Sequence, residues 1–186
     1  MRKINLFLTA LFVMFLMSCG GETTSADAVK SDGTSYKFDF SSAEDFNNHV
    51  VDAINVIDDK EKTLLEIGEE VTGQELENIL NEYKETLTGI IEKLEDTKPY
   101  YAGETFLSST IDYIKVRQEV ANEVWTKIVE IVGERKINEI SEEDADNIDS
   151  LLDPALDREE QALNIMQGQQ NVFALANDSY VEHDEE

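Results

Sequence analysis

The chain has 186 residues, of which 41 are Asp or Glu and 15 are Lys or Arg, so its formal net charge is −26. A surface this acidic repels phosphate backbones and offers no basic patch to anionic lipid headgroups, so we expect no nucleic-acid partner. Hydrophobic residues make up 41% of the chain. That content is enough for a core, and the length suits a single domain.

The N-terminal stretch has the pattern of a targeting segment. Arg2 and Lys3 precede a run from Leu6 to Met17 that is apolar except for Thr9. A helix that crosses a membrane needs about 20 apolar residues, and this run is shorter. A positive start followed by a short apolar run is typical of a secretory signal peptide. We therefore predict that residues 1–18 are a signal peptide.

The end of this run carries a more specific pattern. Leu16-Met17-Ser18-Cys19, followed by Gly20, resembles the lipobox of bacterial lipoproteins. The resemblance implies cleavage before Cys19, a diacylglycerol on its sulfur and an acylated amine, and several acyl chains hold a protein firmly to a membrane. Gly20 resembles the outer-membrane choice of lipoprotein sorting. Whether the protein faces the periplasm or the cell surface stays open.

Cys19 is the only cysteine in the chain. No intramolecular disulfide can therefore form. Residues 19–40 are predicted to be the lipidated Cys and a flexible tether, because they are mostly Gly, Ser, Thr, Asp and Lys. Within them, residues 36–40 alternate aromatic and polar side chains. This pattern indicates either an extended segment on the bundle or a short edge strand with no convincing partner strand.

Two capping boxes predict the starts of the first two helices. Ser41-Ser42-Ala43-Glu44 begins a helix that ends near Gly68, and Lys60 is the one polar break in its apolar seam. Thr72-Gly73-Gln74-Glu75 begins a helix that ends near Thr97, because Lys98-Pro99 disfavours continuation. The apolar residues predicted to face the core are Ala43, Phe46, Val50, Ala53, Ile57, Leu64 and Ile67 in the first helix, and Leu76, Leu80, Tyr83, Leu87, Ile90 and Leu94 in the second.

The third helix is predicted to begin between Glu104 and Thr110 and to stop at Gly133, and it should be the most buried. The fourth begins near Ser141, and Pro154 either kinks it or starts a new helix capped by Asp153. Their predicted core residues are Phe106, Leu107, Ile111, Tyr113, Ile114, Val120, Ala121, Val124, Trp125, Ile128 and Val132, then Ile148, Leu151, Leu152, Leu156, Leu163, Met166, Phe173 and Ala176. Residues 179–186 read as a polar, acidic tail.

Four amphipathic helices joined by short turns predict an all-α fold, an antiparallel up-down-up-down four-helix bundle over residues 41–178. The lipobox, this layout and the closing stretch from Gln169 to Ala174 resemble a family of uncharacterised helical-bundle lipoproteins of Bacteroidetes and spirochaetes, described as surface proteins. The resemblance implies an outer-membrane-associated bundle. It implies no catalytic residue.

The sequence shows no recognisable catalytic or metal-binding motif. Di-iron bundles use Glu-x-x-His pairs, and neither His49 nor His183 has Glu three residues before it. His49-Val50-Val51-Asp52 is only faintly similar to the His-x-x-Glu motif of imelysin-like iron proteins, because Asp replaces Glu. With Cys19 lipidated, no thiol nucleophile remains. We therefore expect no enzymatic activity, no cofactor and no metal site.

One group of aromatic residues is a candidate for recognition, because Tyr and Trp are favoured at binding surfaces. Aromatic residues at helical spacing are also common in cores, and that alternative stays open. Gln170 interrupts the apolar seam, so we expect it near the core or at a pocket. The candidate recognition residues are Tyr100, Tyr101, Phe106, Tyr113 and Trp125.

Two functions fit these patterns. The first is a non-enzymatic interaction module, anchored to a membrane of the cell envelope through Cys19, that presents the bundle to an unknown protein or surface polymer. The second is a carrier that holds a small ligand or metal ion within the bundle.

Overall fold

The computed structural model describes residues 28–29, 35–36 and 39–181. The predicted signal peptide, Cys19, most of the tether and the end of the acidic tail lie outside these residues. The helical domain predicted for residues 41–178 lies within them.

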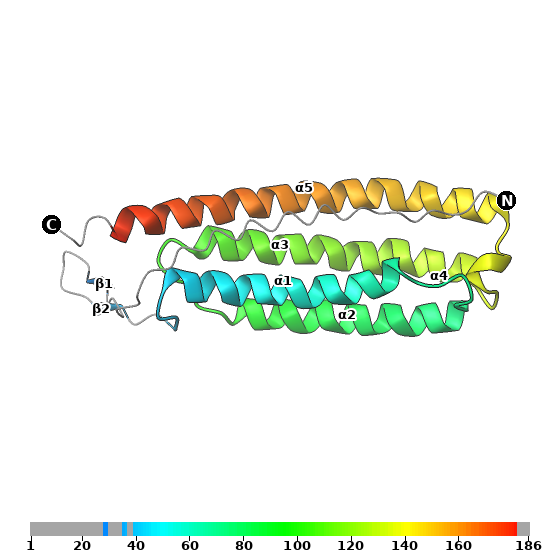
Figure 1. Ribbon diagram of the computed structural model, residues 1–186, viewed down its shortest axis with the longest axis horizontal. Helices are drawn as coiled ribbons and strands as arrows, with labels where there is room; N and C mark the ends of the chain where they lie inside the picture. The colour runs from blue at the N-terminus through cyan, green and yellow to red at the C-terminus, as the bar shows by residue number, and fades with distance from the viewer. Residues whose placement is uncertain (1–27, 30–34, 37–38, 182–186) are drawn as a thin grey trace.

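The described chain is an all-α, antiparallel four-helix bundle, which confirms the predicted fold class (Figure 1). Its first two helices are α1 (Ala43–Leu65) and α2 (Gly73–Glu95). The third rod consists of α3 (Glu104–Val120), a π-helical segment η1 (Ala121–Trp125) and α4 (Thr126–Val132). A 3₁₀ turn, η2 (Ile137–Glu139), leads into the fourth, α5 (Glu142–Val181).

Local side-chain caps account for three of the helix starts. The Thr72 hydroxyl accepts from the Glu75 backbone N–H at 3.3 Å while the Glu75 carboxylate accepts from the Thr72 N–H at 2.8 Å, which confirms that capping box. At α1 the cap is one residue later than predicted, because Ser42 rather than Ser41 accepts from a backbone N–H, that of Asp45. Ser141 caps α5 by accepting from the Asp144 N–H at 3.1 Å.

The α5 helix runs through Pro154 without a break. A new helix capped by Asp153 is therefore not formed. Pro154 lacks the N–H that would bond one turn back, and its ring crowds that carbonyl. Its side chain is exposed, so packing on the core side of α5 continues past it. The helix also extends to Val181, into the residues 179–186 that were predicted to be a tail.

The π-helical segment was not predicted. In it one extra residue enters a turn of the third rod, and Thr126 Oγ1 donates to the Ala121 carbonyl at 3.3 Å, five residues back. Lys84 of α2 donates to the same hydroxyl at 2.8 Å. The contact ties the altered turn to α2.

The buried core follows most of the predicted seam, with some shifts. Ile91 is buried and Ile90 only half-buried, whereas the spacing favoured Ile90. In α5 the seam includes Ala155, and Leu151 and Leu156 are half-buried. Residues fully or almost fully enclosed along the bundle axis include Phe46, Val50, Ile57, Leu64, Leu76, Leu80, Leu87, Leu94, Phe106 and Ile114.

A short antiparallel ladder precedes the bundle. Strands β1 (Ala28–Val29) and β2 (Ser35–Tyr36) pair two residues each. The sequence analysis allowed a strand from Tyr36 but found no partner for it, so β1 was missed. Phe40, at the end of that predicted segment, packs its ring 5.2 Å from the Phe46 ring.

The loops at one end of the bundle are joined by backbone contacts. The Gly73 N–H donates to Arg135 O at 3.2 Å, and the Ile137 N–H donates to Val71 O at 3.1 Å. A Cβ on Gly73 would overlap the carbonyl oxygen of Gly133, so a side chain is excluded there. Among the described residues, no helix is long and apolar enough to span a membrane.

Candidate functional site

One charged side chain, that of Arg117, lies inside the bundle, in the last turn of α3 and so near the middle of the third rod. Arg117 is 1% exposed, and its neighbours on the same helix, Ile114 and Val120, are core residues. The helical spacing 113, 117, 120 places the guanidinium on the buried face of α3. A buried charge is costly unless ion pairs and hydrogen bonds compensate it.

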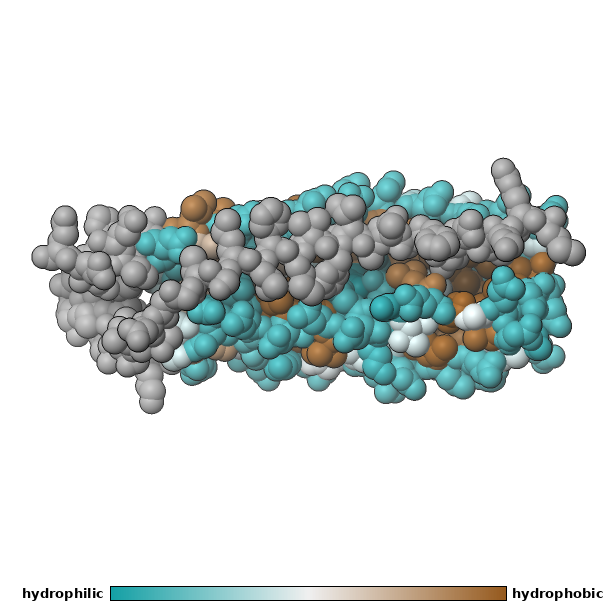
Figure 2. Space-filling model, in the orientation of Figure 1, coloured by the Kyte–Doolittle hydropathy of each residue, from teal (hydrophilic) through white to brown (hydrophobic). Residues whose placement is uncertain are grey.

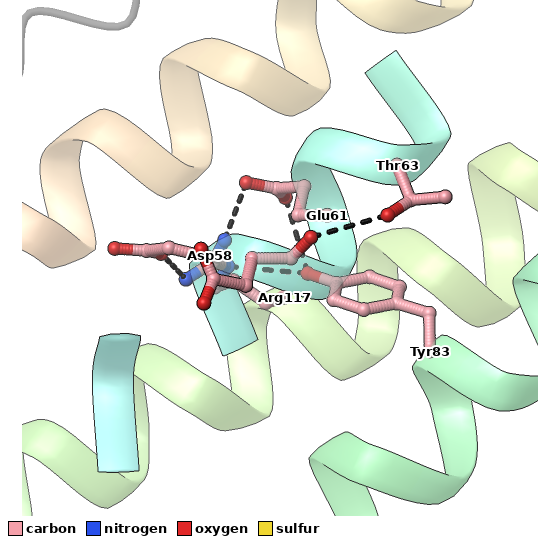
Figure 3. A network of polar contacts seen from close by, with 6 residues as sticks. Asp58, Glu61, Thr63, Tyr83 and Arg117 are labelled. Carbon is pink, nitrogen blue, oxygen red and sulfur yellow. Dashed lines mark hydrogen bonds and ion pairs between the residues drawn. The ribbon is translucent and has the colours of Figure 1, made fainter. Parts of the chain in front are cut away.

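Two neighbouring helices supply those partners (Figure 3). Arg117 Nη1 lies 2.6 Å from Asp58 Oδ1, and Nη2 pairs with Glu61 Oε2; both acids come from α1. From α2, Tyr83 Oη accepts from Arg117 Nε at 3.2 Å and donates to Glu61 Oε1 at 3.1 Å. The network therefore closes on itself around one cation and fixes the register of α1, α2 and α3.

Two phenols line the cation. The Arg117 guanidinium carbon lies 5.3 Å from the centre of the Tyr113 ring, a cation–π distance. Burial raises the pKa of both Tyr83 and Tyr113 above the ordinary value, more than Arg117 lowers it. Both phenols therefore stay protonated at neutral pH, and Tyr83 can donate to Glu61.

The fourth helix contributes an acid to this region. Burial, together with the negative charge of Glu61, raises the pKa of the half-buried Glu159 carboxyl to about 8. Arg117 and Arg158 act in the opposite direction. At neutral pH the Glu159 carboxyl is therefore mostly protonated. It adds no third negative charge beside Asp58 and Glu61, which already pair with Arg117. Protonation lets α5 pack beside an acidic cluster.

The contacts of the cluster suit a role in fixing how the helices pack better than a role in catalysis or ligand binding. The guanidinium donates to Asp58, Glu61 and Tyr83 and stacks on Tyr113, so its binding capacity is directed inward. This cluster was not predicted from the sequence. Two features of the sequence could have indicated it. Arg117 is a basic residue in the apolar stripe of the third helix, and Glu61 is an acid one turn after Ile57 in the stripe of the first.

The predicted aromatic group does not form one surface. Phe106, Tyr113 and Trp125 are 1%, 6% and 4% exposed, whereas Tyr100 is half-buried and Tyr101 is 43% exposed. Phe106 and Trp125 lie in opposite halves of the third rod, about 28 Å apart along the helix at roughly 1.5 Å per residue. Phe106 stacks on Phe173 with ring centres 5.7 Å apart. This placement favours the core interpretation for the buried members.

The remaining singled-out residues have ordinary contacts. His49 Nε2 lies 3.3 Å from Thr97 Oγ1, and burial, with the charge of Lys93, lowers its pKa despite Asp52. Gln170 is half-buried, as expected, and donates to Asn47 Oδ1 at 2.8 Å. Within the described part of the chain, no three His, Cys, Asp or Glu side chains gather as metal ligands would. His183 lies outside that part.

The outer surface holds the other notable feature. Large apolar side chains that are well exposed are Val56, Tyr101, Ile165, Val172 and Leu175, and the last three lie on α5. A groove of about 200 Å³ runs beside Ile165 between α3 and α5, lined by Tyr113, Val116 and Ala162 among others. The apolar exposure is therefore concentrated on the C-terminal half of α5.

Fold and site together define an acidic four-helix bundle that is closed inside by an ion-pair network and apolar on one outer helix face. Comparison with protein-family models, curated proteins and solved structures finds no match to the chain.

Proposed function

We propose that the protein is a bacterial lipoprotein, anchored to a membrane of the cell envelope through Cys19, that presents its helical bundle as a non-enzymatic interaction module. The observation that carries this proposal is the sequence Leu16-Met17-Ser18-Cys19 at the end of a short apolar run. Gly20 favours the outer membrane. The partner is a protein or surface polymer of the envelope rather than a nucleic acid, because the net charge is −26.

The packing of the bundle supports the interaction module over the carrier of a ligand or metal ion. A carrier needs interior room for its cargo, and the middle of this bundle is occupied by Arg117 and its partners. Binding surfaces, in contrast, hold apolar side chains on the outside. Ile165 and Val172 are 63% and 59% exposed on one helix.

Thermal unfolding in the presence of candidate cargo separates the two functions. A ligand that binds the folded state at 100 times its Kd stabilises it by about 2.7 kcal/mol. The interaction module predicts no shift of the midpoint with micromolar Fe, Zn or Ca, or with apolar small molecules. A reproducible rise with any of them would favour the carrier. The partner itself is sought by cross-linking the full chain in intact cells, with the Cys19→Ser form as control.

A further inference from the structure

A stretch without charge stands out on α5. From residue 161 to residue 177 the chain contains no Asp, Glu, Lys, Arg or His, although charged residues make up 30% of the whole sequence. The preceding part of the same helix, residues 142–160, has nine acids and one Arg. The helix is thus acidic in its first half and uncharged through residues 161–177 of its second, before Asp178.

The outward side of this neutral half is apolar at a regular spacing. Ile165, Val172 and Leu175 are 63%, 59% and 67% exposed, and Gly168 lies between the first two. The steps of three, four and three residues are those of a coiled-coil seam. Two residues turn a helix through about 200°, so Gly168 and Leu175 lie on the side of α5 away from the buried Met166 and Phe173. We call these four residues the neutral face of α5.

Figure 2 shows an apolar patch on the upper rim of the molecule, over the C-terminal part of α5. The groove of about 200 Å³ between α3 and α5 borders the other end of the neutral face, because Ile165 lines it. A shallow apolar surface with an adjoining groove is the form in which a partner helix is received.

We propose that the neutral face of α5 binds the same face of a second copy of this chain, with the two α5 helices antiparallel. In an antiparallel coiled coil, an early seam position faces a late one. Ile165 of one copy then lies opposite Leu175 of the other, and Gly168 lies opposite Val172. Large side chains meet at the ends, a small and a larger one meet in the middle, and a two-fold axis makes the surface complementary to itself.

Charge favours this occupant and this direction. Two copies that each carry −26 repel one another over most of their surfaces. Antiparallel overlap of residues 161–177 places uncharged helix against uncharged helix and directs the two acidic halves of α5 away from each other. A basic partner would match an acidic surface better than this uncharged one.

The size of the contact indicates weak association. Residues 161–177 span about 25 Å, and one helix pair of that length falls at the low end of specific interfaces. The inference rests on the proposed interaction module, for which it names one partner. Anchoring would raise the effective concentration toward about 1 mM and so populate a weak dimer.

Sedimentation of the full chain in mild detergent, which measures the mass of the particle, tests the proposal. The chain concentration is about 1 mM, the effective concentration expected from anchoring. We expect a reversible dimer whose fraction rises with salt, since the Debye length falls from about 30 Å at 0.01 M to about 8 Å at 0.15 M. Val172→Glu should weaken dimerisation about tenfold or more. Val56→Glu is the matched control, because Val56 is 48% exposed on α1, and it should leave the dimer unchanged.

Cross-linking tests the direction. Ile165→Cys chains mixed with Leu175→Cys chains should give a 165–175 cross-linked peptide by mass spectrometry, whereas either variant alone should give no 165–165 or 175–175 peptide. A monomer at every salt concentration, or equal effects of the two Val→Glu changes, would overturn the proposal, and a 165–165 link would overturn the antiparallel direction. Fatty-acid labelling of Cys19 is read separately, so failure of the anchor and failure of the dimer are distinguishable.

Discussion

Arg117 shows how one residue can decide the packing of three helices. Its guanidinium is 1% exposed and pairs with Asp58 and Glu61 of α1 while bonding Tyr83 of α2. Such a network gives little net stability over an apolar core, but a partly dismantled one is costly because it leaves buried charge unpaired. The residue therefore selects one register of the helices.

Replacing the cation alone should be strongly destabilising. We expect Arg117→Met to lower the free energy of unfolding by about 3–5 kcal/mol, because Asp58 and Glu61 lose their buried partner. Arg117→Lys should recover little of it, since an ammonium cannot bond two carboxylates and a phenol in the fixed geometry of a guanidinium. Urea unfolding followed by circular dichroism measures both.

A compensated variant makes this test specific. Adding Asp58→Asn and Glu61→Gln to Arg117→Met removes the unpaired charges and should restore most of the lost stability. If the triple variant is as unstable as Arg117→Met, the loss comes from packing rather than from charge.

Glu159 should make the stability of the protein fall as pH rises. Its folded pKa is about 8, whereas the ordinary value is 4.5. Between these values the folded chain binds one more proton than the unfolded chain, so the stability that Glu159 contributes is present below pH 4.5 and is lost as pH rises through about 8. We expect Glu159→Gln to match the wild type near pH 4 and to exceed it by on the order of 5 kcal/mol near pH 9.

Glu160→Gln is the control for this prediction, because it removes the same formal charge from the next, exposed residue. Its effect should stay within about 0.5 kcal/mol at all pH values. A difference between wild type and Glu159→Gln that is constant with pH would show that Glu159 is not held protonated by the fold.

The sequence indicated the core residues better than it indicated this cluster. Leu80, Leu87 and Ile114 fall on regular apolar stripes, so periodicity predicts their burial. Arg117 interrupts such a stripe, and a charged residue in a stripe is usually at its solvent edge. Recognising it requires knowing that the acid at position 61 faces the same point from another helix, which is tertiary information.

At the scale of elements, α5 is a continuous helix that carries a proline, Pro154, in its interior. Proline in a helix interior removes one backbone hydrogen bond and costs about 3 kcal/mol relative to Ala. Since Pro154 is exposed, Pro154→Ala should not disturb the core and should raise the free energy of unfolding by about 1–3 kcal/mol. Thermal unfolding of the two forms measures the difference. No gain would contradict the expectation that Pro154 weakens the helix.

Element boundaries were predictable where local chemistry sets them. Thr72 with Glu75, and Gly133 with its positive φ of 60°, mark a helix start and a helix end that the sequence already showed. The π-helical segment at Ala121–Trp125 was not predictable, because an inserted residue leaves the composition of the stripe unchanged. The pairing of β1 with β2 likewise depends on contacts between segments rather than on either segment alone.

At the scale of the whole molecule, the order of four amphipathic helices with short turns was sufficient to predict an antiparallel bundle. The same pattern did not predict which outer face would be apolar. Only the polar stretch around Gln170 stood out in the sequence, whereas the exposure of Ile165 and Val172 follows from which side of α5 packs on the core. The outer face of a helix is defined by what packs on its other side.

The proposed anchor makes a separate prediction for the molecule in its cell. Cys19 and residues 20–27 lie outside the described residues, and the bundle begins at Ala43 with its own cap at Ser42. Lipid attachment should therefore contribute to location and not to folding. The helical content measured by circular dichroism should be the same with and without the lipid.

The most direct measurement is metabolic labelling with a fatty acid, followed by membrane fractionation of the wild type and Cys19→Ser. Lipid anchoring predicts a labelled wild-type protein in the membrane fraction. It also predicts an unlabelled Cys19→Ser protein that is either uncleaved in the inner membrane or cleaved and free of membranes. An unlabelled wild type would contradict the anchor, and so would a cleaved Cys19→Ser form that still sediments with membranes.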